Sequence, residues 1–217
     1  MKQKRYISRY LTDTYKKLYS YFGPQHWWPA NSAFEVVIGA ILTQNTAWAN
    51  VEKAIVRLKK NRLLTPKRLY ATDVKRIAEF IRPSGYYNIK AVRIKSFLKV
   101  LFAEFKANPS QMFSLDSAAL REKLLQIKGI GPETADSILL YAAKKPIFVV
   151  DAYTRRFLLR HRLINEKVNY QQIQSLFEGN LPHKLKLFNE YHALIVRLAK
   201  EFCRAKPLCN VCPLRKR

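Results

Sequence analysis

Residues 124–155 read LLQIKGIGPETADSILLYAAKKPIFVVDAYTR, and they predict two helices joined by a tight hairpin. The first helix has apolar periodicity up to Lys128 and stops at residues 129–131, where two glycines allow the backbone to turn sharply. Pro132 suits the first position of a second helix, because it has no N–H to lose and its φ is already helical. The free N–H groups at that helix start form a ready site for an anion.

The chain carries a large excess of positive charge, which narrows its partners. Its 217 residues include 40 Lys and Arg but only 15 Asp and Glu, which gives a formal net charge of +25. Self-repulsion of this size is tolerated mainly when a polyanion offsets it. Nucleic acid is therefore the expected partner, with an anionic membrane surface a distant second, and the anion expected at the hairpin is a DNA phosphate.

The sequence also indicates where in the cell the protein is expected. No apolar run approaches the ~18 residues of a membrane span. The basic N-terminal stretch lacks the apolar region of a secretory signal. Three cysteines between residues 203 and 212 do not suggest a disulfide framework. We expect a cytoplasmic protein associated with the nucleoid.

Helical periodicity covers most of the chain. Ser32 and Glu35 form a predicted capping box. The predicted helix starts are Ser32, Thr65, the pair Thr72 and Asp73, and Asp116. The one strand-like run, residues 147–150, reads as a short buried extended segment. The sequence predicts an all-α protein of about ten helices.

Four motifs resemble the helix-hairpin-helix DNA glycosylase superfamily, of which endonuclease III is a member. They are LTQNT (42–46), SGYYNIKA (84–91), KGIGPETAD (128–136) and VVDAYTRR (149–156). The resemblance covers about residues 27–212 and implies two helical domains with DNA bound in the cleft between them. By analogy, a six-helix domain with the hairpin spans residues 25–145. A second helical domain combines residues 1–24 with 146–217 and contains the cysteine loop.

Asp151 is the candidate catalytic residue that the resemblance implies. Cleavage of an N-glycosidic bond builds positive charge on the sugar, and a fixed carboxylate stabilises that charge while it orients or deprotonates water. The same residue also suits the N-cap of the helix that follows it. Both roles can coexist.

The hairpin departs from the bifunctional members of the superfamily. In those members, a lysine two residues after the second hairpin glycine attacks the sugar and forms a Schiff base. Glu133 stands at this position here, and a carboxylate cannot form the imine. Lys128 lies on the other side of the turn, where a phosphate contact or a solvated side chain is the simpler interpretation. The expected DNA-backbone contacts are Lys128, Gly129, Ile130, Gly131 and Thr134.

The three tryptophans of the chain lie close together in sequence and form the expected base pocket, which comprises Trp27, Trp28, Pro29 and Trp48. A damaged base must be flipped out of the stack before it is processed. Indole faces attract positively charged alkylated purines by cation–π stacking worth ~1–2 kcal/mol when desolvated. Together with the motifs above, the WWP element resembles the endonuclease-III-like 3-methyladenine glycosylases. Core packing is the alternative for each tryptophan.

Gln44 is the candidate DNA wedge. In the superfamily, the side chain at this position enters the gap left by the flipped base. The alternative is a capping loop, because Asn45 and Thr46 both suit helix caps. Tyr86 and Tyr87 are candidates for a second stacking contact, with core packing as the alternative.

Cys203, Cys209 and Cys212 resemble the loop that ligates a 4Fe–4S cluster in many superfamily members. Such clusters take four thiolates, and this chain has three. A fourth in the usual register would directly follow the last residue of this sequence. Three interpretations stay open: a cluster completed by a missing residue, zinc with a ligand other than cysteine, or a relic loop that contacts phosphates. The basic residues of that loop are Arg204, Lys206, Arg215, Lys216 and Arg217.

The histidines show no metal-ligand or triad spacing. They are His26, His161, His183 and His192. His192 lies on an apolar helix face, so we expect a hydrogen-bonded core histidine rather than a catalytic one.

The leading prediction is a monofunctional DNA N-glycosylase for alkylated purines, in particular 3-methyladenine, in base-excision repair. It would act as a monomer on double-stranded DNA with a damaged base, without a membrane partner. One alternative is a bifunctional endonuclease III-type glycosylase and AP lyase for oxidised pyrimidines, which would use Lys128 or another lysine. The other is a non-catalytic binder of damaged DNA.

Overall fold

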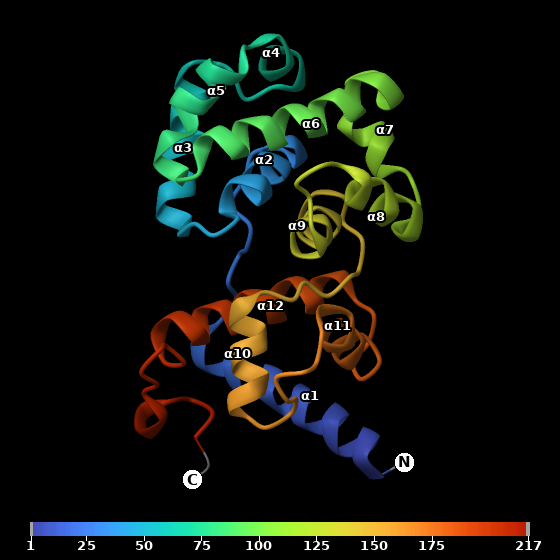
Figure 1. Cartoon of the computed structure of the whole chain (residues 1–217). Coiled ribbons are helices and arrows are strands. Elements are labelled where there is room, and N and C mark those ends of the chain that lie inside the picture. Colours follow the sequence, from blue (N-terminus) through green and yellow to red (C-terminus); the bar gives the residue numbers. More distant parts are fainter. Residues whose placement is uncertain (1, 216–217) are drawn as a thin grey trace. The chain divides into compact units, whose positions relative to one another are not determined.

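The computed structural model describes residues 2–215, and over this range the chain forms twelve α-helices and no strand (Figure 1). The all-α prediction is confirmed. Two of the basic residues named above, Lys216 and Arg217, lie outside the described residues. None of the helices in the described range combines the length and apolar character needed to cross a membrane.

The chain divides into two compact units. One, here called the central unit, runs from Ala30 to Lys145. The other, here called the terminal unit, combines the residues up to Pro29 with those from Pro146 onward. Each unit is described by itself.

The central unit holds eight α-helices. They are α2 (Ala33–Thr43), α3 (Trp48–Lys60), α4 (Pro66–Ala71), α5 (Val74–Ile81), α6 (Tyr87–Phe105), α7 (Pro109–Phe113), α8 (Ser117–Gln126) and α9 (Pro132–Ser137). A 3₁₀ turn, η1 (Arg82–Ser84), precedes α6, and a π-helical turn, η2 (Ile138–Ala142), continues α9. Helix α2 is buried from residue 34 to residue 42, and it packs against α3, α6 and η2. It is the core of this unit.

The predicted helix starts are confirmed by hydrogen bonds from nearby backbone N–H groups. The side chains of Ser32, Thr65, Asp73 and Asp116 each accept from an N–H two or three residues ahead. One of the two hydrogen bonds of the capping box is present, from the Glu35 N–H to the Ser32 hydroxyl. The Glu35 carboxylate accepts from the Asn31 N–H at 3.1 Å instead of from the Ser32 N–H. The Glu35 carboxylate also forms an ion pair with Lys59 of α3 at 2.6 Å, so it contacts a second helix as well.

The terminal unit holds α1 (Lys2–Phe22), α10 (Ala152–Arg160), α11 (Tyr170–Glu178) and α12 (Leu185–Glu201), with a 3₁₀ turn η3 (Cys209–Val211) near its end. Helix α12 packs against both α1 and α10. The extended segment before α10 is confirmed: Phe148, Val149 and Val150 are buried without helical structure. Helix α11 holds the backbone of this extended segment, because the Gln174 side chain donates to the Phe148 carbonyl at 2.8 Å.

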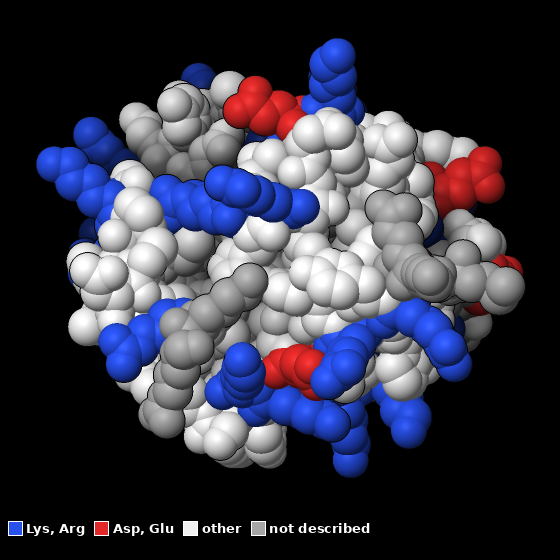
Figure 2. Space-filling model, turned by 90° about the horizontal axis from the view of Figure 1, so that it is seen from below, with Lys and Arg blue, Asp and Glu red and all other residues white. Residues whose placement is uncertain are grey.

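Positive charge reaches the surface of the protein. On the face shown in Figure 2, Lys and Arg side chains form several groups, whereas Asp and Glu occur in few places. A surface of this kind suits the phosphate backbone of nucleic acid.

Candidate functional site

Asp151 lies at the N-terminus of α10 and has partners on both carboxylate oxygens. Its Oδ1 accepts a hydrogen bond from the Thr154 N–H at 2.7 Å, which confirms the N-cap interpretation. Its Oδ2 lies 3.5 Å from Nε2 of His192 on α12. The Asp151 side chain is 13% exposed and the His192 side chain 8%. The carboxylate is thus fixed from two sides while a small part of it stays accessible.

The surroundings of Asp151 keep it ionised. Burial by itself raises the pKa of the carboxyl, but the hydrogen bond and charge of His192 and the Thr154 N–H outweigh it. The net result is a pKa below the ordinary aspartate value. A carboxylate of this kind offers a fixed negative charge at neutral pH, as stabilisation of a cationic sugar requires.

His192 is buried as the sequence predicted, but its partner was not foreseen. The expected core histidine lies against the one residue for which catalysis was predicted. No sequence signal links the two, because they are far apart in the chain and meet only where α12 packs on α10.

Trp27 and Trp28 lie together in the terminal unit. Their ring centroids are 6.3 Å apart in an edge-to-face arrangement, and both side chains are half-buried, whereas Pro29 is exposed. The Lys200 Nζ of α12 lies 5.7 Å from the centroid of the Trp27 ring. This indole therefore already attracts a cation within the protein.

Trp48 belongs to the central unit, where it is the first residue of α3 and half-buried. The structure thus brings two of the three tryptophans into contact and places the third in the other unit. All three keep part of their surface exposed, which distinguishes them from the fully buried core residues.

The predicted hairpin is confirmed between α8 and α9. Gly129 has a φ of +92°, which favours glycine, and Gly131 is the N-cap before Pro132. The side chain of Lys128 is exposed and that of Ile130 is buried. Glu133 is exposed in the first turn of α9, so no lysine stands at the position that bifunctional members use.

Gln44 ends α2 and reaches the hairpin. Its side-chain Nε2 donates to the Gly129 carbonyl at 3.0 Å and to the Thr134 hydroxyl at 2.8 Å. Its Oε1 accepts from the guanidinium of Arg93 on α6. The expected wedge thus belongs to one hydrogen-bonded cluster with Arg93 and two groups of the hairpin and helix α9, the Gly129 carbonyl and the Thr134 hydroxyl.

Around the neighbouring turns, two other residues are prominent on the surface. Asn45 is exposed at φ +52°. Tyr86 is 70% exposed at φ +46°, so packing in the core does not explain it. The prediction that Tyr86 makes a stacking contact remains a prediction.

Lys90 and Arg93 of α6 were missed by the sequence analysis. Lys90 is only 1% exposed, and its Nζ donates to the Leu42 carbonyl at 2.8 Å, the Ser84 carbonyl at 2.7 Å and the Thr46 hydroxyl at 2.6 Å. Burial, and to a smaller degree the charge of Arg93, lower the pKa of Lys90 to about 8. Lys90 thereby joins the turn after α2 to the turn before α6.

The three cysteines do not form a cluster site in the described residues. Cys203 is buried, Cys209 is exposed and Cys212 is intermediate. No group of three or more Cys, His, Asp or Glu side chains in residues 2–215 is arranged to hold a metal ion. The Cys203 Sγ instead accepts from the Arg160 guanidinium at 3.3 Å. Three thiols are one fewer than a four-thiolate cluster takes, and the iron–sulfur expectation stays a prediction.

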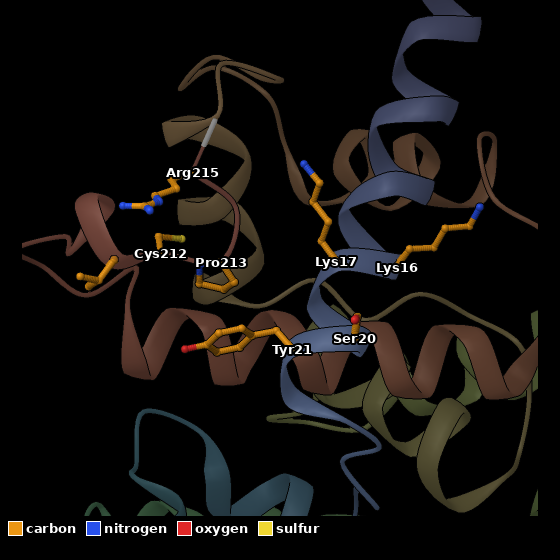
Figure 3. A pocket seen from close by; sticks show the side chains of 8 residues that line it. Lys16, Lys17, Ser20, Tyr21, Cys212, Pro213 and Arg215 are labelled. Carbon is orange, nitrogen blue, oxygen red and sulfur yellow. The ribbon is translucent and has the colours of Figure 1, made fainter. Parts of the chain in front are cut away.

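The loop after Cys203 borders a cavity of about 790 Å³ beside α1 (Figure 3). Lys16 and Lys17 of α1 line it together with Cys212 and Arg215. Burial raises the pKa of the Cys212 thiol. Cationic side chains around the cavity favour the interpretation of this loop as a phosphate contact.

Comparison with known proteins agrees with this arrangement. Residues 38–183 match the family described as the HhH-GPD superfamily base excision DNA repair protein. A Methanocaldococcus jannaschii protein, provisionally named a DNA repair glycosylase, is 50% identical over 204 residues, which cover 93% of this chain and 92% of the relative.

Solved structures show the same fold. The H. pylori 3-methyladenine DNA glycosylase bound to 1,N6-ethenoadenine is 29% identical with a TM-score of 0.74, over 91% of this chain and 97% of the other. Endonuclease III in a non-covalent complex with DNA has a TM-score of 0.82 at 20% identity, over 95% and 92% of the two chains. The chain belongs to the HhH-GPD superfamily and is a DNA-binding glycosylase of base-excision repair.

Proposed function

We propose that the protein is a monofunctional DNA glycosylase that removes alkylated purines, in particular 3-methyladenine, and leaves an abasic site. Glu133 carries the first part of this proposal. It occupies the hairpin position of the family's lyase lysine, and its carboxylate cannot form a Schiff base.

Lys90 does not replace the missing nucleophile. Its lowered pKa is a property that Schiff-base lysines share. However, its amine is buried and each of its three protons has an acceptor. A lyase reaction would therefore have to use another lysine, such as Lys128 on the exposed side of the hairpin.

Asp151 carries the chemistry. The Thr154 N–H and the His192 ring hold its two oxygens, so the negative charge is fixed in place. When the N-glycosidic bond stretches, this charge stabilises the developing positive charge of the sugar, and the carboxylate orients a water for attack. An alkylated purine is already a cationic leaving group, so the reaction needs little acid catalysis.

The tryptophans support an alkylated purine as the substrate. Trp27 and Trp28 are half-buried, and the Trp27 ring holds the ammonium of Lys200. The exposed part of an indole face can stack on a cationic purine. The structural relative from H. pylori is named for 3-methyladenine and was solved with an adenine derivative.

Base release from methylated DNA tests the proposal. Wild-type protein should release 3-methyladenine, Asp151→Asn should not, and borohydride should trap no covalent adduct with either. Asp116→Asn is a matched control, because Asp116 is also a capping aspartate and Asn keeps the cap.

Three outcomes would contradict the proposal, each in a different part. A trapped adduct would establish the bifunctional alternative. Release of uracil or of mismatched thymine, without release of methylated purines, would overturn the substrate. Tight binding to damaged DNA without any base release would favour the non-catalytic binder.

A further inference from the structure

The Gln44 side chain is bound at both ends of its amide. Its NH₂ group contacts the Gly129 carbonyl and the Thr134 hydroxyl, and its carbonyl oxygen contacts Arg93. A side chain in this arrangement has no free donor or acceptor pair with which to enter DNA, unless these contacts open. The four residues Gln44, Arg93, Gly129 and Thr134 are here called the Gln44 latch.

Arg93 is fitted to the hairpin by shape as well as by its charge. A Cβ atom at Gly129 would lie 2.3 Å from the Arg93 Cγ and 2.8 Å from its Cδ. A side chain at this position would force Arg93 to shift, so the glycine leaves room for the aliphatic part of Arg93 in its present place. Gly129 therefore serves both the turn of the hairpin and the closed latch.

The backbone around Gln44 is held separately. Lys90 lies one turn before Arg93 on α6 and binds the carbonyl of Leu42 and the hydroxyl of Thr46, on either side of Gln44. Thr46 also donates to the Ser84 carbonyl at 2.5 Å. With the backbone fixed in this way, the side chain of Gln44 is the part that can change position.

A DNA phosphate competes for Arg93. A guanidinium forms stronger, bidentate and charge-assisted bonds with a phosphate than with a neutral amide. Arg93 is half-exposed and its side chain lies on Gly129, within the hairpin that the family resemblance assigns to the DNA backbone. Binding of a phosphate there removes the contact that holds the Gln44 carbonyl oxygen.

We propose that Arg93 is a positioning residue that holds Gln44 against the hairpin in the free protein and releases it when a DNA phosphate binds. Backbone binding and insertion of Gln44 into the duplex are then coupled through one guanidinium. This inference rests on the proposed glycosylase function, because it takes Gln44 as the residue that enters the gap.

Two substitutions open the latch by different routes. Arg93→Met removes the guanidinium but keeps the length of the side chain. Thr134→Val removes one acceptor of the Gln44 amide at nearly constant shape and leaves the charge of Arg93 in place. Arg76→Met is the matched control, because Arg76 is an exposed arginine on α5 outside the latch.

The probe is a duplex with a tetrahydrofuran abasic site opposite 2-aminopurine. The same duplex without the abasic site is measured in parallel for comparison. Fluorescence of 2-aminopurine reports the insertion of a side chain, and anisotropy reports affinity. Both latch variants should raise the ratio of abasic to undamaged affinity about fivefold or more, with faster insertion. Arg93→Met alone should also lower the slope of log affinity against log salt by about 1.

A Gln44→Ala background separates the latch from a general structural effect. There, Arg93→Met and Thr134→Val should no longer change the affinity ratio, although the salt effect of Arg93→Met should persist. The proposal is wrong if either variant changes the ratio equally with and without Gln44, or if both leave insertion unchanged while their melting temperatures match the wild type.

The binding assays require no base release, so the two proposals fail separately. Intact latch behaviour without release of methylated purines would refute the substrate and leave the latch. Normal release with no effect of the latch variants on insertion would refute the latch and leave the substrate.

Discussion

Two buried charges lie in the two units of this protein, and their surroundings differ in kind. Asp151 in the terminal unit is held by hydrogen-bond donors, one of them an imidazole, and the pKa of its carboxyl falls below its ordinary value in spite of burial. Lys90 in the central unit is held by neutral oxygens alone, and its pKa falls to about 8 because burial and Arg93 disfavour the ammonium.

The two residues differ in how accessible the charged group is and in which groups bind it. Asp151 stays ionised at neutral pH and keeps part of its surface accessible, which agrees with the catalytic role proposed for it. Lys90 is buried and donates its hydrogen bonds at the ends of two neighbouring helical segments. Carbonyl groups at such ends have no partner within the helix and need other donors. The Asp151 charge stays partly accessible, as the proposed catalytic role requires, whereas the Lys90 charge is used in hydrogen bonds within the fold.

The sharpest way to break this comparison is to neutralise each charge in turn. Asp151→Asn should lower single-turnover base release by about 10²–10⁴-fold, the usual contribution of a positioned acid or base. Its melting temperature should stay close to that of the wild type, because Asn also caps helices well. A variant that loses stability but keeps activity would reverse the assignment of Asp151.

Lys90→Met should show the opposite pattern. It leaves the Leu42 and Ser84 carbonyls without their donor, so we expect the free energy of unfolding to fall by about 2–4 kcal/mol. Urea unfolding measures this loss. Lys99→Met, at an exposed position of the same helix, is the control and should have little effect. Equal stability of both variants would mean that the buried amine contributes nothing.

His192→Leu sharpens the account of the carboxylate. Removal of the ring contact should raise the pKa of Asp151, so that the acid limb of base release moves up by about 1–3 pH units. His192→Gln retains a donor and should restore part of the difference. His183→Gln, at an exposed position, is the control. An unchanged acid limb with a uniformly lower rate would indicate packing alone.

The smallest effect is a pH dependence of stability that belongs to Lys90. The unfolded chain keeps this proton up to about pH 10.4, whereas the folded chain loses it near pH 8. Between these values the unfolded state binds more protons, so the free energy of unfolding should rise with pH by at most about 1.4 kcal/mol per unit. Below pH 8 this contribution should be flat.

The same unfolding series on Lys90→Met should lack that rise. Asp151 contributes with the same sign in the acid range: its lowered pKa stabilises the fold above about pH 4, and this stabilisation is lost as the pH falls further. The free energy of unfolding of Asp151→Asn should therefore depend less on pH in the acid range than that of the wild type. Identical pH profiles for wild type and Lys90→Met would show that Lys90 does not titrate in this range.

Local structure and family membership could both be predicted from the sequence. A capping side chain and the N–H groups that it binds lie within three residues, so Ser32, Asp73, Asp116 and Asp151 could be placed from the sequence. The hairpin was equally clear, because Gly129, Gly131 and Pro132 fix the backbone locally, and Gly129 has the positive φ that favours glycine. The order of four such motifs sufficed to identify the superfamily.

Contacts between side chains far apart in the sequence depend on how the helices pack. His192 reaches Asp151 because α12 packs on α10, and Arg93 reaches Gln44 because α6 packs on α2. The burial of Lys90 follows from the same packing, and no property of the residues around it in sequence reveals it. Local hydrogen bonds depend on sequence neighbours, whereas the partners of a buried charge depend on how helices far apart in the chain pack together.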